Sequence, residues 1–185
     1  MRKFHILFSL FVFALIVSAC TASKDDVLIV RERHDNWAND PAFISKLSQD
    51  ANPKYAANKR MVLEFEAALI RAQSIGDKEP GNIDEIAEKY MAADYVQNDP
   101  SFPQGLQGFV NFFRFIKKSG ERVSHPPSAI MAEGDLVTLL MFRPPLPDPD
   151  DKTKTKTYTG YRIAIWRIKD GKLLEHWGPG TKGNP

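Results

Sequence analysis

The sequence predicts an α+β domain, because the spacing of its apolar residues changes once along the chain. Between 58 and 120, three segments carry apolar residues three or four positions apart, the spacing of an amphipathic helix, and the third shows the full i, i+3, i+4, i+7 pattern. From 129 onward, short apolar or alternating runs stand between turn signals, as in strands. Three helices followed by consecutive strands favour an antiparallel sheet on which the helices pack.

The three predicted helices have recognisable starts and stops. The first begins near Asn58 and ends before Gly76. Its apolar residues are Val62, Phe65, Leu69 and Ala72. The second begins at Asn82, with Glu85 three residues later as in a capping box. Its apolar side comprises Ile83, Ile86 and Tyr90. The third ends at Gly120, and its apolar side comprises Phe109, Phe112, Phe113 and Ile116.

Tight turns separate the predicted strands. We expect strands at 129–133, 136–143, 158–168 and 173–177. Gly134-Asp135 separates the first two, and Asp170-Gly171 is a strong hairpin signal between the last two. The segment 144–149 is rich in proline, which donates no hydrogen bond to a sheet. We therefore expect it to be a long loop that joins two strands.

The first residues are typical of a secretory signal. Arg2 and Lys3 precede an apolar segment, 4–17, that is shorter than the ~20 residues needed to span a membrane. The segment 17–20 ends at Cys20 and resembles the bacterial lipobox, so we expect cleavage before this cysteine and its lipidation. The alternative is an ordinary signal peptide with an incidental cysteine, but Cys20 is the only cysteine in the chain.

Lipid on Cys20 would hold the mature chain on a membrane without a spanning helix, because several acyl chains exceed the two signals needed for stable anchoring. Thr21 after the cysteine resembles the outer-membrane class of lipoproteins. We therefore expect a place in the bacterial cell envelope, on the outer membrane facing the periplasm. The expected organisation is a signal peptide (1–19), a lipidated N-terminus and tether (20–57), a domain (58–178) and a flexible tail (179–185).

The tether is expected to have little regular structure. Residues 27–30 form a short apolar run, and Asp40-Pro41 and Asn52-Pro53 are interpreted as chain breakers. We expect the segment to act as a spacer that packs on the domain.

Composition excludes several classes of function. The segment 1–19 contains two of the 25 Lys and Arg residues and none of the 23 Asp and Glu residues, so the mature chain would be formally neutral. A neutral chain without a basic cluster argues against nucleic-acid binding. His34, His125 and His176 lie too far apart for a metal motif. The G-x-G-x-x-G pattern at 178–183 lacks the helix that a dinucleotide site requires. We expect no cofactor.

Three short stretches carry a family resemblance: YVQNDP at 95–100, AEGDLV at 132–137 and WRIKDGKLLEHW at 166–177. In this order they are similar to the Y-I-Q-H-N-P, A-E-G-D-x-V and F-R-V-x-D-G-K-I-x-E-H-W stretches of SnoaL-like polyketide cyclases. These enzymes are members of the nuclear transport factor 2-like superfamily. The resemblance covers approximately residues 58–178.

The resemblance implies a cone of three helices wrapped on a curved antiparallel sheet. It also implies one apolar pocket, homodimers formed through the sheet, and an aspartate in the pocket that acts as general acid and base. At the matching positions this chain has Ala164 in place of the aspartate and Asn98 in place of the family's histidine. Neither side chain titrates, so both departures count against the aldol-type cyclase chemistry.

Strand alternation suggests how the pocket is lined. Arg162, Ala164 and Trp166 share one face of a strand, and this face points inward if Ala164 keeps the direction that the resemblance implies. Arg162 would then favour a carboxylate or phosphate ligand; the alternative is that it lies at the rim and pairs with an acidic neighbour. The complete predicted pocket comprises Tyr90, Tyr95, Gln97, Asn98, Phe112, Phe113, Arg162, Ala164, Trp166 and Trp177.

Two residues are candidates for acid–base chemistry. His176 lies on the last strand and has an imidazole that titrates near neutral pH when it is unperturbed. The alternative is a structural histidine at the sheet edge. Asp99 could be a base whose pKa is raised by burial, or a turn residue before Pro100.

Three functions are consistent with these observations. The first is a lipid-anchored envelope protein that binds a small, mostly apolar molecule or carboxylic acid in its pocket without cyclase chemistry. The second is a divergent isomerase, lyase or hydrolase that uses His176. The third is an assembly lipoprotein with a vestigial pocket. Fold alone does not decide between them.

Overall fold

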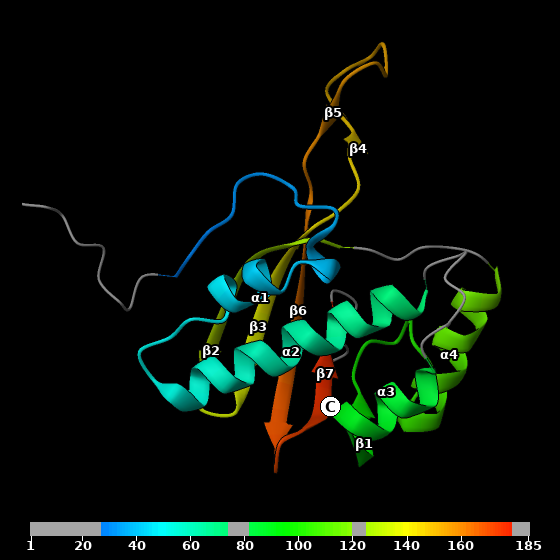
Figure 1. Cartoon of the computed structure of the whole chain (residues 1–185). Helices are drawn as coiled ribbons and strands as arrows, with labels where there is room; N and C mark the ends of the chain where they lie inside the picture. Colours follow the sequence, from blue (N-terminus) through cyan, green and yellow to red (C-terminus); the bar gives the residue numbers. More distant parts are fainter. Residues whose placement is uncertain (1–26, 74–81, 120–124, 179–185) are drawn as a thin grey trace, which may run out of the picture.

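The computed structural model describes residues 27–73, 82–119 and 125–178 (Figure 1). The predicted signal peptide, Cys20, the stops at Gly76 and Gly120 and the tail therefore lie outside the described residues. Within the described ranges, no helix has the length and apolar character needed to cross a membrane.

Five strands form one curved sheet in the order β1-β7-β6-β3-β2. They are β1 (Met91–Gln97), β2 (Pro127–Glu133), β3 (Leu136–Phe142), β6 (Tyr161–Lys169) and β7 (Lys172–Trp177). The pairing of β1 with β7 is parallel, and the other pairings are antiparallel. The sequence-based expectation of an α+β fold with a mostly antiparallel sheet is confirmed.

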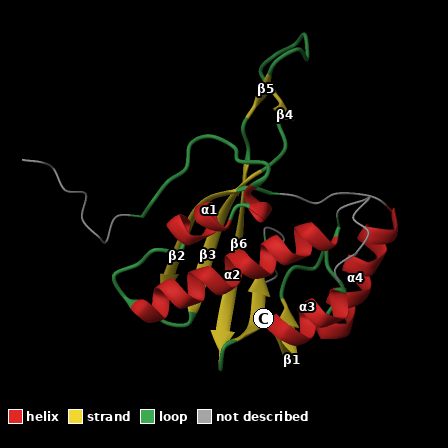
Figure 2. Ribbon diagram, viewed as in Figure 1, coloured by secondary structure: helices red, strands yellow, loops and turns green. Residues whose placement is uncertain are grey.

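Helices cover one face of this sheet (Figure 2). They are η1 (Trp37–Asn39), α1 (Pro41–Leu47), α2 (Pro53–Ala72), α3 (Ile83–Tyr90) and α4 (Gly105–Ser119). The long helix α2 crosses the sheet, while α3 and α4 lie at the edge formed by β1. Asn82 caps α3 by accepting a hydrogen bond from the Asp84 backbone N–H at 3.0 Å, and Lys172 donates to the carbonyls of Glu88 and Lys89 at its other end. A cation at this end also complements the helix dipole.

The region before residue 58 contains more regular structure than expected, and the helix predicted to begin near Asn58 begins earlier. The α2 helix begins at Pro53, and Trp37 is buried in the core with only 1% of its surface exposed. The pairs interpreted as breakers are helix starts. The side chain of Asp40 accepts from the Phe43 N–H, and Asn52 precedes Pro53 at the first helical position. A polar N-cap followed by proline is a helix signal, because proline lacks only an N–H that has no partner there.

Strand β1 is missing from the sequence-based expectations. It follows α3 directly, with no glycine or proline between them, and its two alanines and Asp94 give no strong strand pattern. The turn at Asp170-Gly171 was expected, and both residues have positive φ values, 50° and 72°. Such values match the two-residue hairpin turn that joins right-twisted strands.

The proline-rich segment joins β3 to β6, as expected, but it contains a short ladder of its own. Leu146–Pro147 (β4) pairs with Thr157–Tyr158 (β5), and the two project away from the rest of the domain as an arm (Figure 1). At the tip, Asp151 accepts hydrogen bonds from the backbone N–H groups of Thr155 and Lys156 at 2.8 and 2.7 Å. The arm is therefore shaped by local polar contacts rather than by the core.

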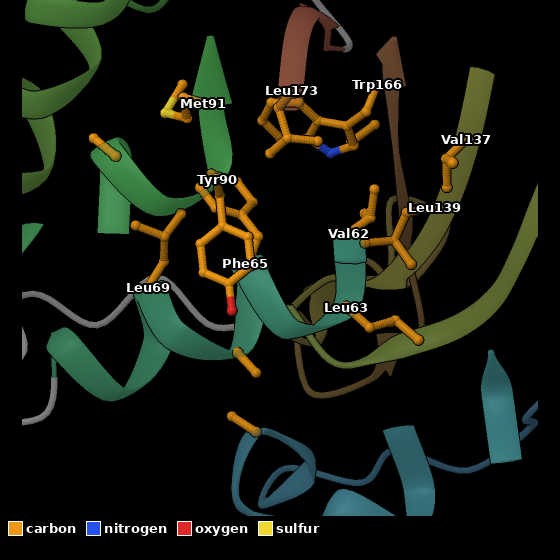
Figure 3. Packing of buried hydrophobic residues seen from close by; sticks show 14 of the residues in the cluster. Val62, Leu63, Phe65, Leu69, Tyr90, Met91, Val137, Leu139, Trp166 and Leu173 are labelled. Atoms are coloured by element: carbon orange, nitrogen blue, oxygen red, sulfur yellow. The ribbon is translucent and has the colours of Figure 1, made fainter. Parts of the chain in front are cut away.

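The core lies between α2 and the inner face of the sheet (Figure 3). Phe65 is fully buried and contacts Tyr90, Phe109 and Trp166, with ring centroids 5.8, 5.8 and 5.2 Å away. Val62 on α2 and Val137 and Leu139 on β3 belong to the same buried cluster, with Val62 toward β3. This packing fixes α2 above β6 and so positions the side chains described next.

Candidate ligand-binding site

An inner cavity of about 170 Å³ lies between α2, α4 and the sheet. Its apolar wall comprises Leu69, Ile70, Phe102, Phe109, Phe112, Phe113, Met141 and Trp166. Its polar residues are Glu66, Gln73, Gln97, His125, Arg162 and His176. An apolar enclosure with a few convergent polar groups has the usual character of a small-molecule site.

The alternation of β6 explains how Arg162 and Trp166 reach this cavity. Ala164, between them, is buried on the same face, whereas Tyr161 and Ile163 on the other face are about half exposed, at 49% and 50%. Ala164 is not among the residues that line the cavity.

The Arg162 guanidinium is the cation of the cavity. Its Nε atom is buried and has no hydrogen-bond partner in the described part of the chain. Its charge also acts on Glu66, His125 and His176, which come from three different parts of the fold. An arginine with an unsatisfied buried N–H is a strong site for an oxyanion.

Glu66 faces the same cavity and was not among the sequence-based candidates. Burial raises the pKa of its carboxyl to about 7, although the Arg162 charge and the Trp166 indole N–H act in the opposite direction. The Trp166 Nε1 atom itself makes no hydrogen bond of normal geometry. A signal was present in the sequence: Glu66 stands four residues after Val62 and three before Leu69, on the apolar stripe of the helix.

His176 is buried and held in one tautomer. Its Nδ1 atom lies 2.9 Å from Gln97 Oε1, and the same oxygen accepts from the Asp99 N–H at 3.0 Å. The Gln97 Nε2 group donates to Tyr95 Oη, so His176 must donate from Nδ1. Burial first, and the Arg162 charge second, lower the pKa of His176 to about 3. The ring also stacks on Trp166, with centroids 4.1 Å apart.

This environment does not suit His176 to acid–base catalysis. A general acid or base works best when its pKa lies near the working pH, and an imidazole with a pKa of about 3 stays neutral there. The sequence-based hypothesis of a titrating His176 is therefore corrected, because burial beside Arg162 penalises the imidazolium ion.

Of the two alternatives for Asp99, the structure favours the turn residue, because the pKa of its carboxyl is lowered and not raised. Burial acts to raise the pKa of its carboxyl, but hydrogen bonds from the Ser101 hydroxyl and N–H at 2.5 and 3.0 Å outweigh it and lower the pKa. The charges of His176 and Arg162 add to this lowering.

The other predicted pocket residues lie around the cavity rather than in it. Tyr90 packs against Phe65, and Tyr95 lies in the core under Trp166. Asn98 donates to Glu175 Oε1 at 2.9 Å. Trp177 follows His176 in β7 and therefore faces the opposite side of the sheet, where its ring lies 5.4 Å from the Arg167 guanidinium carbon. Phe112, Phe113, Gln97, Arg162 and Trp166 do line the cavity.

A second, more open cavity of about 800 Å³ lies on the outer face of the sheet. Trp177, Tyr161 and Ile163 line it, together with Asp99. Phe102, His125 and Arg162 line both cavities, so the two approach each other at these side chains. Burial lowers the pKa of His125 to about 4, with a further lowering by Arg162, so this residue is also neutral at physiological pH. No cluster of metal-ligating side chains occurs among the described residues.

Comparisons with known proteins find likeness among solved structures only. No protein-family model matches the sequence, and no curated protein is similar to it at a significant level. Among solved structures, a SnoaL-like polyketide cyclase from Agrobacterium tumefaciens is similar at a TM-score of 0.44 and 12% identity, over 65% of this chain and 88% of that one. The fold resembles that of SnoaL-like and nuclear transport factor 2-like proteins.

Two further structures show the same level of likeness. TsrD from Streptomyces laurentii is 20% identical, with a TM-score of 0.42 over 64% of this chain and 86% of its own. A nuclear transport factor 2-like protein of unknown function from Burkholderia pseudomallei is 15% identical, with a TM-score of 0.42 over 65% of this chain and 87% of its own. At this level the likeness concerns the fold and not the activity.

Proposed function

We propose that this chain is a lipid-anchored envelope protein whose domain binds a small, mostly apolar acid in the inner cavity, without cyclase chemistry. One observation carries this proposal. The cavity holds a guanidinium with an unsatisfied buried N–H, while most of the surrounding wall is aromatic or aliphatic.

The chemistry of the wall supports a ligand with two unlike ends. The Phe109, Phe112 and Phe113 rings favour an apolar or aromatic body, which gains by leaving water. Arg162 favours a carboxylate, because its planar fork matches the two carboxylate oxygens. The volume of about 170 Å³ lies below the ~300–1,000 Å³ typical of drug-sized ligands. A single-ring aromatic acid is therefore the size of ligand that we expect.

The enzymatic alternative has less support. An isomerase, lyase or hydrolase based on His176 needs a proton donor and acceptor at neutral pH, but the pKa of His176 is about 3. The position that would hold the family's aspartate is Ala164, which is buried and transfers no proton. Binding needs neither group, since it depends on shape and on Arg162.

Replacing Arg162 with methionine is expected to weaken the binding of phenylacetate by about 30-fold or more, measured by titration calorimetry of the purified chain. Truncating one member of a buried charge pair costs ~2–5 kcal/mol, and methionine keeps much of the side-chain volume. The matched control is Arg60→Met, because Arg60 is half exposed on α2 and does not line the inner cavity. Equal phenylacetate affinity in Arg162→Met and the wild type would contradict the proposal.

The membrane anchor belongs to the same proposal. It is supported by the sequence at 17–20, which resembles a lipobox around the only cysteine. In a bacterial host, Cys20→Ser is expected to move the protein from the membrane pellet to the soluble fraction, as followed by immunoblotting. A variant that stays membrane-bound would contradict anchoring through Cys20. The homodimer implied by the resemblance stays a prediction, which the mass of the soluble chain in solution tests.

A further inference from the structure

We propose that the inner cavity takes its acidic ligand together with a proton, and that Glu66 carries this proton. The inference rests on the proposed function, and it adds a second, coupled ligand to the same site. It makes Glu66, on α2, a residue that determines which charge state of the site binds the acid.

The geometry places two anions in competition for one cation. Glu66 and Arg162 line the same cavity from opposite layers of the fold, one on α2 and the other on β6. The structure describes no ion pair or hydrogen bond between the two side chains, and the Arg162 Nε atom is unsatisfied. A ligand carboxylate at Arg162 would therefore lie close to the Glu66 carboxyl in a largely apolar enclosure.

Two carboxylates cannot both stay ionised in such a site at neutral pH. Like charges that share a desolvated space raise the pKa of one of them, so that one proton is retained between the two groups. A neutral Glu66 also becomes a donor, since its O–H group can hydrogen-bond to a ligand oxygen. The proton comes from solvent and goes to a Glu66 oxygen, while the ligand keeps its charge for Arg162.

The other groups around the cavity leave Glu66 as the site of this proton. His125, which precedes β2, and His176 on β7 have pKa values of about 4 and 3. The pKa of Asp99, after β1, is lowered, and burial raises that of Tyr95 on β1 far above its usual range. Only Glu66 has a pKa near 7 among the described cavity groups whose pKa is shifted. The charged side chains that act on these groups include Arg162 and Asp99.

The coupling has a measurable consequence. Above the pKa of Glu66, each further pH unit removes about nine-tenths of the protonated form, so the dissociation constant of an anionic ligand increases about tenfold per unit. A neutral ligand of the same shape lacks the second negative charge and is expected to show little dependence on pH. Proton uptake by Glu66 and binding of the acid are therefore two measurements of the same coupled equilibrium.

The test is titration calorimetry of the full mature chain with phenylacetate and with phenylacetamide at pH 6, 7, 8 and 9. Two buffers with different enthalpies of ionisation report the protons taken up per ligand. In the wild type we expect phenylacetate to weaken about tenfold from pH 8 to pH 9, with close to one proton taken up. In Glu66→Gln, which keeps the size and a hydrogen-bond donor but cannot titrate, we expect affinity independent of pH and no proton uptake.

The outcomes distinguish a failure of the proton coupling from a failure of the proposed binding function. If phenylacetate binding in the wild type depends on Arg162 but not on pH, the proton coupling is wrong and the proposed function stands. If Glu66→Gln shows the same pH dependence as the wild type, another group carries the proton and the assignment to Glu66 is wrong. If neither probe binds to the wild type at any pH, the proposed function is overturned, and the coupling with it.

Discussion

Replacing Phe65 with alanine is expected to lower the free energy of unfolding by about 3–5 kcal/mol. Phe65 has no exposed surface and contacts Tyr90, Phe109 and Trp166, which belong to two helices and the central part of the sheet. Alanine would leave a cavity at the point where these elements meet. The surrounding rings are themselves held by other contacts, so they can collapse into the gap only in part.

Urea unfolding of the purified protein, followed by tryptophan fluorescence, measures this effect. The matched control is Phe115→Ala on α4, since Phe115 is 65% exposed and its removal should change the free energy by less than about 0.5 kcal/mol. Equal destabilisation by the two variants would show that the arrangement of the aromatic core is not as described.

Replacing Glu66 with glutamine is expected to stabilise the unliganded protein at alkaline pH. The folded-state pKa of Glu66 is about 7, above its ordinary value of 4.5. Between these two values the folded state binds more protons than the unfolded state, so the contribution of Glu66 to stability falls as pH rises through this window. Glutamine does not titrate. From pH 5 to pH 8, the difference in unfolding free energy should therefore move by roughly 2–3 kcal/mol in favour of the variant.

Two histidines change the free energy of unfolding with pH in the opposite direction, but their contribution is the same in the variant and in the wild type. His125 and His176 have folded-state pKa values of about 4 and 3, below their ordinary value of 6.5, so their contributions rise with pH up to about that value. Both proteins contain them. The measurement is a series of urea unfolding curves at each pH, with Glu64→Gln as control, since Glu64 lies on α2 with its side chain 42% exposed. A constant difference between Glu66→Gln and the wild type from pH 5 to pH 8 would contradict a raised pKa at Glu66.

Elements with strong periodicity were predictable from the sequence. The apolar stripes of α2 and α4 and the turn at Asp170-Gly171 depend on local pattern, and the structure contains them. Strand β1 depends on its parallel pairing with β7, which lies more than 70 residues later in the chain. No local pattern in Met91–Gln97 encodes that pairing, so tertiary contact decides its structure. The start of α2 differs from the expected one because Asn52-Pro53 is a helix start, with Asn52 as the N-cap, and not a breaker.

The part of the candidate site that lies on a single strand was predictable from the sequence. Alternation along β6 places both Arg162 and Trp166 inward, as the structure shows. The same rule excludes Trp177 once His176 is placed inward, because adjacent strand residues face opposite sides. Glu66 and His125 come from a helix and a loop, and their approach to Arg162 depends on how α2 crosses the sheet. The pKa values of Glu66 and His125 depend on the burial and the proximity to Arg162 that result from this arrangement, and no local sequence pattern specifies either one.

The strand order determines when, during folding, the wall of the inner cavity is complete. Among the described residues, β1 pairs only with β7, and β7 is the last strand that the structure describes. Two cavity residues, Gln97 and His176, lie on these strands and are joined by a hydrogen bond. The wall of the cavity is thus completed only after the final residues of the domain have been synthesised and have docked, which is a slow, long-range step in folding. The hydrogen bond between Gln97 and His176, and the part of the cavity wall that these two residues form, are therefore absent until β7 has paired with β1.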